Sequence, residues 1–205
     1  MGSEQAAQER LLTFAKKEFL EKGYQKASLR SICSQAHLTT GAVYFLFKDK
    51  EGLFAAIVEP VYQMLLRTLH EHFSEDATED FTTYIHTPGD HDDFAEKLVH
   101  VLYSHYDVVT LLLSKSAGSK YENIIDRIIE LVEVNFGAMA EKYAMTIPGK
   151  QVNPFMTHWL SHVSVLAFVH LLSHVDDEGK ALMYIKPVME HIIVGWLQFA
   201  LEDEK

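Results

Sequence analysis

The chain contains little of what would break or cross-link a fold. Among 205 residues there are 1 cysteine, 5 prolines and 10 glycines. A single cysteine, Cys33, excludes an intramolecular disulfide and suits a reducing compartment. Because proline and glycine are the residues that interrupt regular structure, their scarcity leaves long segments free to form helices.

Long apolar runs are also missing. The most apolar run, 163–172, holds ten residues and includes Ser164 and His170. We expect it to be too short to cross a bilayer. The first residues, Met1 to Ser3, lead directly into polar sequence, so we expect no signal peptide. Hydrophobic residues make up 48% and charged residues 23%, which is typical of an ordinary folded domain and argues against disorder.

Positive charge is scarce as a whole but not everywhere. The net charge of −11, taken alone, argues against a nucleic-acid-binding protein. Residues 1–50 nevertheless carry eight basic and five acidic side chains, whereas 51–205 carry ten basic and 24 acidic ones. A locally basic segment on an acidic body favours an N-terminal site for a polyanion. Chance variation explains so small an excess equally well.

What the sequence has in abundance is helical periodicity. Apolar residues recur at spacings of three and four through most of the chain. Gly23 is placed to end the first helix, Ser28 and Asp49 to cap later ones, and Pro60 to bend the fourth. The sequence therefore predicts an all-α fold. The expected helices cover 4–22, 28–35, 39–47, 49–73, 92–106, 107–116, 120–145, 152–174 and 178–202, with a helical patch near 81–85.

The last predicted helix has a regular apolar seam. Its members step by three and four: Leu182, Ile185, Met189, Ile192, Trp196 and Phe199. Together with the very apolar helix at 152–174, it carries more apolar surface than one neighbour covers. We therefore predict a homodimer through 152–174 and 178–202, arranged as a two-fold four-helix bundle. A thick core within one chain is the alternative.

Two short helices near the N-terminus form a predicted helix-turn-helix. The segment 28–35, a three-residue turn and the segment 39–47 match this motif, whose second helix lies in the major groove of DNA. Thr39, Thr40 and Gly41 would bring hydroxyls and a bare backbone close to bases and phosphates, and the hydroxyl of Tyr44 would reach a phosphate. Phe47 should turn inward. The predicted phosphate contacts are Lys48, Lys50, Ser28 and Arg30. Ordinary caps and core aromatics of a small helical unit are the alternative.

Residues 11–57 resemble the DNA-binding domain of the tetracycline-repressor (TetR) family. The resemblance rests on Ala15-x-x-x-Phe19, Gly23-Tyr24, the Ser-Leu-Arg-x-Ile segment at 28–32, Tyr44-x-x-Phe47-x-x-Lys50 and Leu53. It implies an all-α, dimeric, cytoplasmic bacterial protein that represses transcription until a small ligand binds. The expected organisation is a helix-turn-helix three-helix DNA-binding domain at 1–48 and a helical ligand-binding and dimerisation domain at 49–205. The implied partners are a palindromic double-stranded DNA operator and an unidentified effector.

Two residues depart from the family pattern. His37 replaces the glycine usual in the turn, where the backbone often needs a left-handed conformation. Phe45 replaces a histidine common at a position that often faces DNA. Phe45 either packs, or makes apolar contact with a thymine methyl group or the sugar backbone. It joins the predicted DNA-contacting residues.

The family resemblance also implies a ligand cavity. Residues that combine an aromatic or flexible apolar body with an occasional polar group are the candidates, and they suit a hydrophobic or aromatic ligand. They are Tyr103, Tyr106, Met139, Trp159, His162 and Phe168. No phosphate-binding glycine loop or nucleophile motif appears, so we predict neither an enzyme nor a cofactor.

The twelve histidines offer a different interpretation. The pairs His158/His162 and His170/His174 are spaced to place two imidazoles on one helical face. No third ligand is positioned by the sequence, so we predict no metal site. A histidine-based metal-binding helical protein, and an activator with the same fold, remain the alternative functions.

Overall fold

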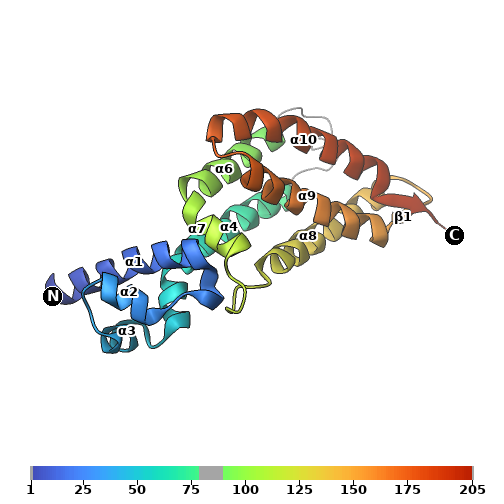
Figure 1. Cartoon of the computed structure of the whole chain (residues 1–205). Helices are drawn as coiled ribbons and strands as arrows, with labels where there is room; N and C mark the ends of the chain where they lie inside the picture. Colours follow the sequence, from blue (N-terminus) through green and yellow to red (C-terminus); the bar gives the residue numbers. More distant parts are fainter. Residues whose placement is uncertain (1, 79–89, 205) are drawn as a thin grey trace. The chain divides into compact units, whose positions relative to one another are not determined.

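The computed structural model describes residues 2–78 and 90–204 (Figure 1). These residues are almost entirely helical, which confirms the predicted all-α class. The helical patch expected near 81–85 lies outside the described residues. The elements are α1 (Gly2–Lys26), α2 (Leu29–Gln35), α3 (Thr40–Phe47), α4 (Lys50–Thr78), α6 (Asp90–Ser104), α7 (Tyr106–Ser114), α8 (Ile124–Thr146), β1 (Lys150–Val152), α9 (Pro154–His174), α10 (Glu178–Phe199) and β2 (Leu201–Asp203).

The chain divides into two compact units. Unit 1 comprises Met1–Met64 and His105–Ile124, and unit 2 comprises Leu65–Ser104 and Ile125–Lys205. The predicted DNA-binding segment, 1–48, lies wholly within unit 1. A functional boundary at residue 48 stays a prediction.

Unit 1 is built on aromatic side chains. Phe19 and Phe54 are fully buried and meet edge to face with ring centroids 5.0 Å apart. Tyr121, from the segment that follows α7, packs against Phe54 at 5.9 Å. Such tilted and edge-on pairs stabilise a core beyond their buried area. The core of unit 1 thus joins residues more than a hundred positions apart in the chain.

The predicted helix ends of unit 1 are largely confirmed. Gly23 interrupts α1 with a φ of 74°, and one further helical turn follows to Lys26. Ser28 accepts a bond from the amide of Ser31 at 3.3 Å, and Asp49 accepts one from Gly52 at 2.7 Å. His37 adopts a left-handed φ of 54°, as the family pattern suggested. Lys48 also has a positive φ, 71°, which the sequence analysis did not predict.

In unit 2 the apolar seam of α10 faces its own chain. Ile185, Ile192 and Trp196 are at most 5% exposed. Trp196 packs with Leu160 of α9 and Ala140 of α8, and Phe136 and Tyr143 surround it. The buried part of the seam is therefore in the core of one chain, because α9 and α6 pack against α10 and α8 reaches it at Trp196. Ile192 and Trp196 are not available for contact with a second copy, contrary to the sequence-based expectation.

A short antiparallel ribbon was not predicted. β1 pairs with β2 in the register Lys150↔Asp203, Gln151↔Glu202 and Val152↔Leu201. The ammonium group of Lys150 lies 2.7 Å from the carboxylate of Asp203, which lowers the pKa of that carboxyl through this hydrogen bond and charge. Strands of three residues are too short to show a period of two. Their pairing ends α10 at Phe199, before the predicted residue 202.

One helix of the described residues, α9, has the length and composition that could cross a membrane. Its 21 residues extend the run at 163–172, which alone is too short. Core helices of other proteins meet the same criterion. The buried face of α9, which includes Leu160, Phe168 and Leu172, packs within unit 2, where α9 is a neighbour of α10. This packing gives α9 the role of a core helix.

Candidate nucleic-acid interface

Helix α3 has one buried and one bare face. Val43 is fully buried and Phe47 is 7% exposed, as predicted for Phe47. These two residues are four apart, so they anchor one side of an eight-residue helix. The residues predicted to contact DNA occupy the other side or its flanks, and all are exposed: Thr39, Thr40, Gly41, Tyr44, Phe45 and Lys48. Thr39 is the N-cap residue, and its side chain makes no capping bond.

The start of α2 is held by a buried carboxylate that the sequence analysis missed. Glu18, 2% exposed, accepts bonds from the amide of Ser28 at 3.1 Å and the hydroxyl of Ser31 at 3.1 Å. Lys22 donates to it at 2.7 Å. Burial alone would raise the pKa of Glu18, but these donors outweigh burial and hold it below its usual value. Glu18 therefore fixes α2 on α1 and leaves Ser28 and Arg30 exposed.

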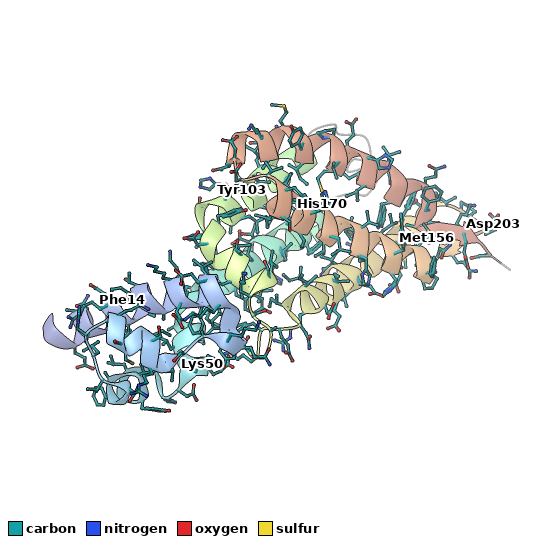
Figure 2. The ribbon with its side chains drawn as sticks, in the orientation of Figure 1. Phe14, Lys50, Tyr103, Met156, His170 and Asp203 are labelled. Carbon is teal, nitrogen blue, oxygen red and sulfur yellow. The ribbon has the colours of Figure 1, made fainter. Side chains whose placement is uncertain are left out.

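The two predicted phosphate-binding lysines have different surroundings. Lys48 is exposed at the end of α3. Lys50, labelled in Figure 2, is half-buried: its ammonium donates to the carbonyl of Gln25 at 3.2 Å and lies 4.8 Å from the ring centre of Tyr24. Burial lowers the pKa of Lys50, and the charge of Glu18 partly offsets this. Lys50 thus contacts the end of α1, whereas Lys48 is free to point into solvent.

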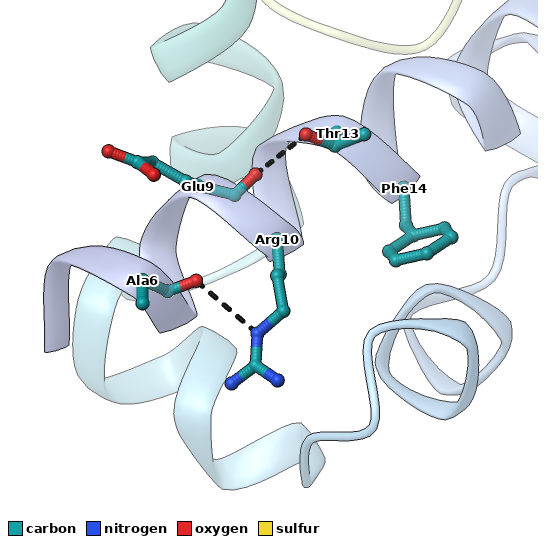
Figure 3. A pocket seen from close by; sticks show the side chains of 5 residues that line it. All are labelled: Ala6, Glu9, Arg10, Thr13 and Phe14. Atoms are coloured by element: carbon teal, nitrogen blue, oxygen red, sulfur yellow. Dashed lines mark hydrogen bonds between the residues drawn. The ribbon is translucent and has the colours of Figure 1, made fainter. Parts of the chain in front are cut away.

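An open hollow of about 670 Å³ lies along α1 in unit 1 (Figure 3). Its lining consists of Ala6, Glu9, Arg10, Thr13 and Phe14. The Nε of Arg10 donates to the backbone carbonyl of Ala6 at 3.3 Å. The hydroxyl of Thr13 donates to the backbone carbonyl of Glu9 at 2.8 Å. No sequence pattern marks Arg10, because a lone arginine on an amphipathic helix looks like any solvated side chain.

The segment between α7 and α8 is tied to the first half of α4. The hydroxyl of Tyr121 donates to the carboxylate of Glu59, and Gln63 donates to Glu59 at 2.8 Å. These hydrogen bonds lower the pKa of Glu59, while burial, followed by the bond to Glu59, raises the pKa of Tyr121. About two turns earlier in α4, Glu51 accepts bonds from the hydroxyl of Tyr24 and from the amide of Lys120. Glu59 directly precedes Pro60, so the predicted bend site of α4 carries a fixed polar contact.

The six predicted ligand residues are distributed over both units. Tyr106 belongs to unit 1, and the other five belong to unit 2. In unit 2, Tyr103 donates its hydroxyl to the carbonyl of Val175 at 2.8 Å, Phe168 is 8% exposed and Trp159 is 47% exposed. Met139 packs beside the Trp196 cluster. A common ligand site for these residues therefore stays a prediction.

The paired histidines of α9 make local contacts. The rings of His158 and His162 lie 4.6 Å apart, and His158 Nδ1 lies 2.9 Å from a carboxylate oxygen of Glu133. The rings of His170 and His174 stack at 4.1 Å. Within residues 2–78 and 90–204, no group of three or more His, Cys, Asp or Glu side chains is arranged to hold a metal ion. The pairs are thus accounted for by contacts along one helix and to α8.

Comparison with known proteins points to the same segment. The pattern defining bacterial regulatory proteins of the tetR family matches residues 11–57. A stretch of 50 residues is 40% identical to the HTH-type transcriptional repressor BepR of Brucella suis, covering 24% of each chain. The chain thus spans about a quarter of that curated relative's length.

Solved structures match over most of the chain. A transcriptional regulator from Aquifex aeolicus is 26% identical, with a TM-score of 0.58, covering 91% of this chain and 99% of that one. The regulator PfmR from Thermus thermophilus shares the fold at 16% identity, with a TM-score of 0.60 over 91% and 98% of the two chains. The helix-turn-helix geometry, the N-terminal family pattern and this likeness agree: residues 11–57 carry the pattern of the tetR family of bacterial regulatory proteins, and the chain shares its fold with solved transcriptional regulators.

Proposed function

We propose that this chain is a bacterial, cytoplasmic transcriptional repressor that binds a palindromic DNA operator as a homodimer. A small hydrophobic or aromatic molecule bound by the C-terminal domain, 49–205, releases it. The observation that carries the proposal is the bare face of α3. Hydroxyls, aromatic rings and an ammonium group face outward there, while Val43 and Phe47 are buried on the other side of the helix.

Each side chain on this face has a chemical task at DNA. Thr39 and Thr40 lie at the N-terminal end of α3, where a recognition helix meets base edges and phosphates. The hydroxyl of Tyr44 donates to a phosphate oxygen. Lys48 neutralises a phosphate, and Ser28 and Arg30 do the same at the start of α2. Phosphate contacts position the protein, and contacts to bases select the sequence.

An exposed apolar surface on unit 2 supports the homodimer. On α9, Phe155, Trp159 and Leu166 are 70%, 47% and 45% exposed. On α10, Tyr184 and Val188 form a second stripe that Phe199, the last residue of the seam, extends; Val188 is 41% exposed. A second copy covers these faces in a self-complementary interface that lies beside the buried part of the seam. Dimerisation then sets two α3 helices at the spacing of successive major grooves, about 34 Å.

Helix α4 provides the route by which a ligand acts on α3. It begins beside α3, and its first half belongs to unit 1 while its second half belongs to unit 2. A ligand that favours a different tilt of α4 changes the separation of the two α3 helices. Linkage requires the two effects to be equal: DNA must lower the affinity for ligand by the same factor by which ligand lowers the affinity for DNA. Pro60→Ala tests the bend: it should preserve folding and change the size of the ligand-induced shift.

The deciding experiment is selection of bound duplexes from a random DNA library, followed by mapping of bound sites in a genome. A palindrome whose half-sites are separated by one helical turn supports the proposal. Binding that ignores sequence at all salt concentrations contradicts it. A promoter reporter with the selected site then distinguishes a repressor from an activator. Metal analysis of the purified protein tests the histidine-based alternative, which requires stoichiometric metal.

A further inference from the structure

The exposure of the Phe45 ring is not explained by packing within the chain. Phe45 is 78% exposed, and no aromatic side chain in the described residues is more exposed. The contacts that hold α3 come from Val43 and Phe47, on the opposite side. An apolar ring in water costs free energy that burial would recover. A ring so placed is useful only to a partner that covers it.

Gly41 is a second residue that the fold does not explain. Its backbone φ is not in the left-handed region, and a Cβ added there meets only the hydroxyl of Thr39, at 3.5 Å. Glycine inside a helix is nevertheless unfavourable compared with alanine. The residue is therefore not required by the backbone or by packing within the chain. Its bare, exposed backbone leaves room for a close approach from outside.

The two residues are four apart and lie on the same face. Helical side chains lean toward the N-terminus, so Phe45 points along this face toward the turn that contains Gly41. Gly41 is exposed and has no side chain, so the backbone on this face is bare, with the Thr39 hydroxyl as its nearest neighbour. This bare backbone lies at the end of α3 that meets base edges in the proposed complex.

We propose that Gly41 and Phe45 together select thymine in the operator by enclosing its 5-methyl group. In the major groove, thymine differs from cytosine by its O4 acceptor and by this methyl group. A phenyl ring and a glycine backbone offer no side-chain hydrogen bond, so the methyl group is the feature that they contact. This inference rests on the proposed DNA-binding function and specifies what its site recognises.

The experiment uses the full chain and a duplex selected from a random library. Each dT in turn is replaced by dU, which removes the methyl group and leaves the base-pairing groups unchanged. We expect one position in each half-site where wild-type affinity falls roughly fourfold, the effect of removing one buried methyl-sized group. Phe45→Ala should bind the dT and dU duplexes equally well, and Phe45→Leu should keep part of the difference. A 5-methylcytosine at that position should bind better than cytosine.

Two controls make the outcome decisive. Met145→Ala removes a side chain that is 85% exposed on α8 and should keep the full difference between dT and dU. Circular dichroism should show that Phe45→Ala is folded, because an exposed ring contributes little to the core. The inference is overturned if no dT position responds, or if the response survives in Phe45→Ala. Failure to select any duplex contradicts the proposed function itself, and this inference with it.

Discussion

Units 1 and 2 position their exposed side chains by different means. In unit 1, the buried carboxylate of Glu18 and the partly exposed one of Glu59 hold the backbone and side chains of neighbouring segments through directed hydrogen bonds. In unit 2, the Trp196 cluster and the cluster of Leu69, Phe73 and Val132 hold the helices mainly through apolar contact. Its salt bridges, such as Lys186–Glu96 at 2.5 Å, lie on the surface.

The difference corresponds to what each unit is proposed to contact. Recognition of base edges requires side chains fixed within a fraction of an ångström, and directional hydrogen bonds provide this. Enclosing an apolar ligand and a second copy requires surfaces that can repack, and apolar contacts allow this. We therefore expect removal of a hydrogen-bonding polar group to lower the stability of unit 1. New charges on the exposed apolar surface of unit 2 should instead prevent its assembly with a second copy.

The largest effect should come from charging the exposed stripes of unit 2. Trp159→Glu combined with Val188→Glu introduces charge where the second copy is proposed to lie. We expect monomers by light scattering and a loss of operator affinity on the order of a thousandfold, because the two half-sites no longer bind as one unit. Val134→Glu, on an exposed position of α8, should remain dimeric. An unchanged mass in the double variant would place the interface elsewhere.

Removal of the Glu18 carboxylate should have the next largest effect. Glu18→Ala leaves the amide of Ser28 and the hydroxyl of Ser31 without their acceptor, at a cost of about 2–3 kcal/mol in unfolding free energy. Urea denaturation measures this loss. Hydrogen exchange should place it in α1 and α2, and exchange that is faster throughout unit 2 would contradict the division.

The same carboxylate gives a signed pH dependence. The folded state lowers the pKa of Glu18 below its ordinary value of 4.5, so the unfolded chain takes up the proton first as the solution is acidified. Its stabilising contribution is therefore present above about pH 4.5 and lost as pH falls below that value. Glu18→Ala should lose less stability than the wild type between pH 5 and pH 3. An equal loss would show that the acid sensitivity arises from other groups.

A smaller effect is expected at the contact between Tyr121 and α4. Tyr121→Phe keeps the ring against Phe54 and removes the hydroxyl that donates to Glu59. Loss of a hydrogen bond to a charged group should cost about 1.5 kcal/mol of unfolding free energy. The companion variant Tyr62→Phe should change it by less than roughly 0.5 kcal/mol. Equal effects would mean that the Tyr121 hydroxyl does not matter.

The smallest effect should distinguish the two lysines. Lys48→Ala should weaken binding to all sequences alike and reduce the salt dependence of the binding constant by about one unit. Lys50→Ala should leave the salt slope nearly unchanged and lower stability, because its ammonium bonds to Gln25 and packs on Tyr24. A reduced slope only in Lys50→Ala would reverse the two roles.

The sequence predicted those features that depend on neighbouring residues. Helix ends at Gly23, Ser28 and Asp49 follow from local backbone chemistry, and the inward turn of Phe47 follows from periodicity. It could not predict the burial of Glu18, because its acceptor role depends on Ser28 and Ser31, ten and thirteen residues further on. A glutamate on an amphipathic helix is usually solvated.

The α10 seam shows the second limit of sequence patterns. The spacing of three and four correctly located an apolar stripe on α10. Such a pattern does not identify the helix or the second chain that packs against the stripe. α9 and α6 cover most of it from within the same chain, with α8 at Trp196, so the surface left for a partner lies beside the buried residues. The β1–β2 ribbon likewise pairs residues about fifty positions apart, and no local pattern marks them.

The discontinuous composition of unit 1 bears on how the protein is made. Residues 105–124 complete a unit whose first part ends at Met64. While a ribosome is still adding the residues before Tyr121, the rings of Phe19 and Phe54 lack one of their covers. The emerging segment 1–64 therefore stays partly assembled for about sixty further residues of synthesis. A fragment that stops after residue 64 should have this incompletely packed core and not that of the finished unit.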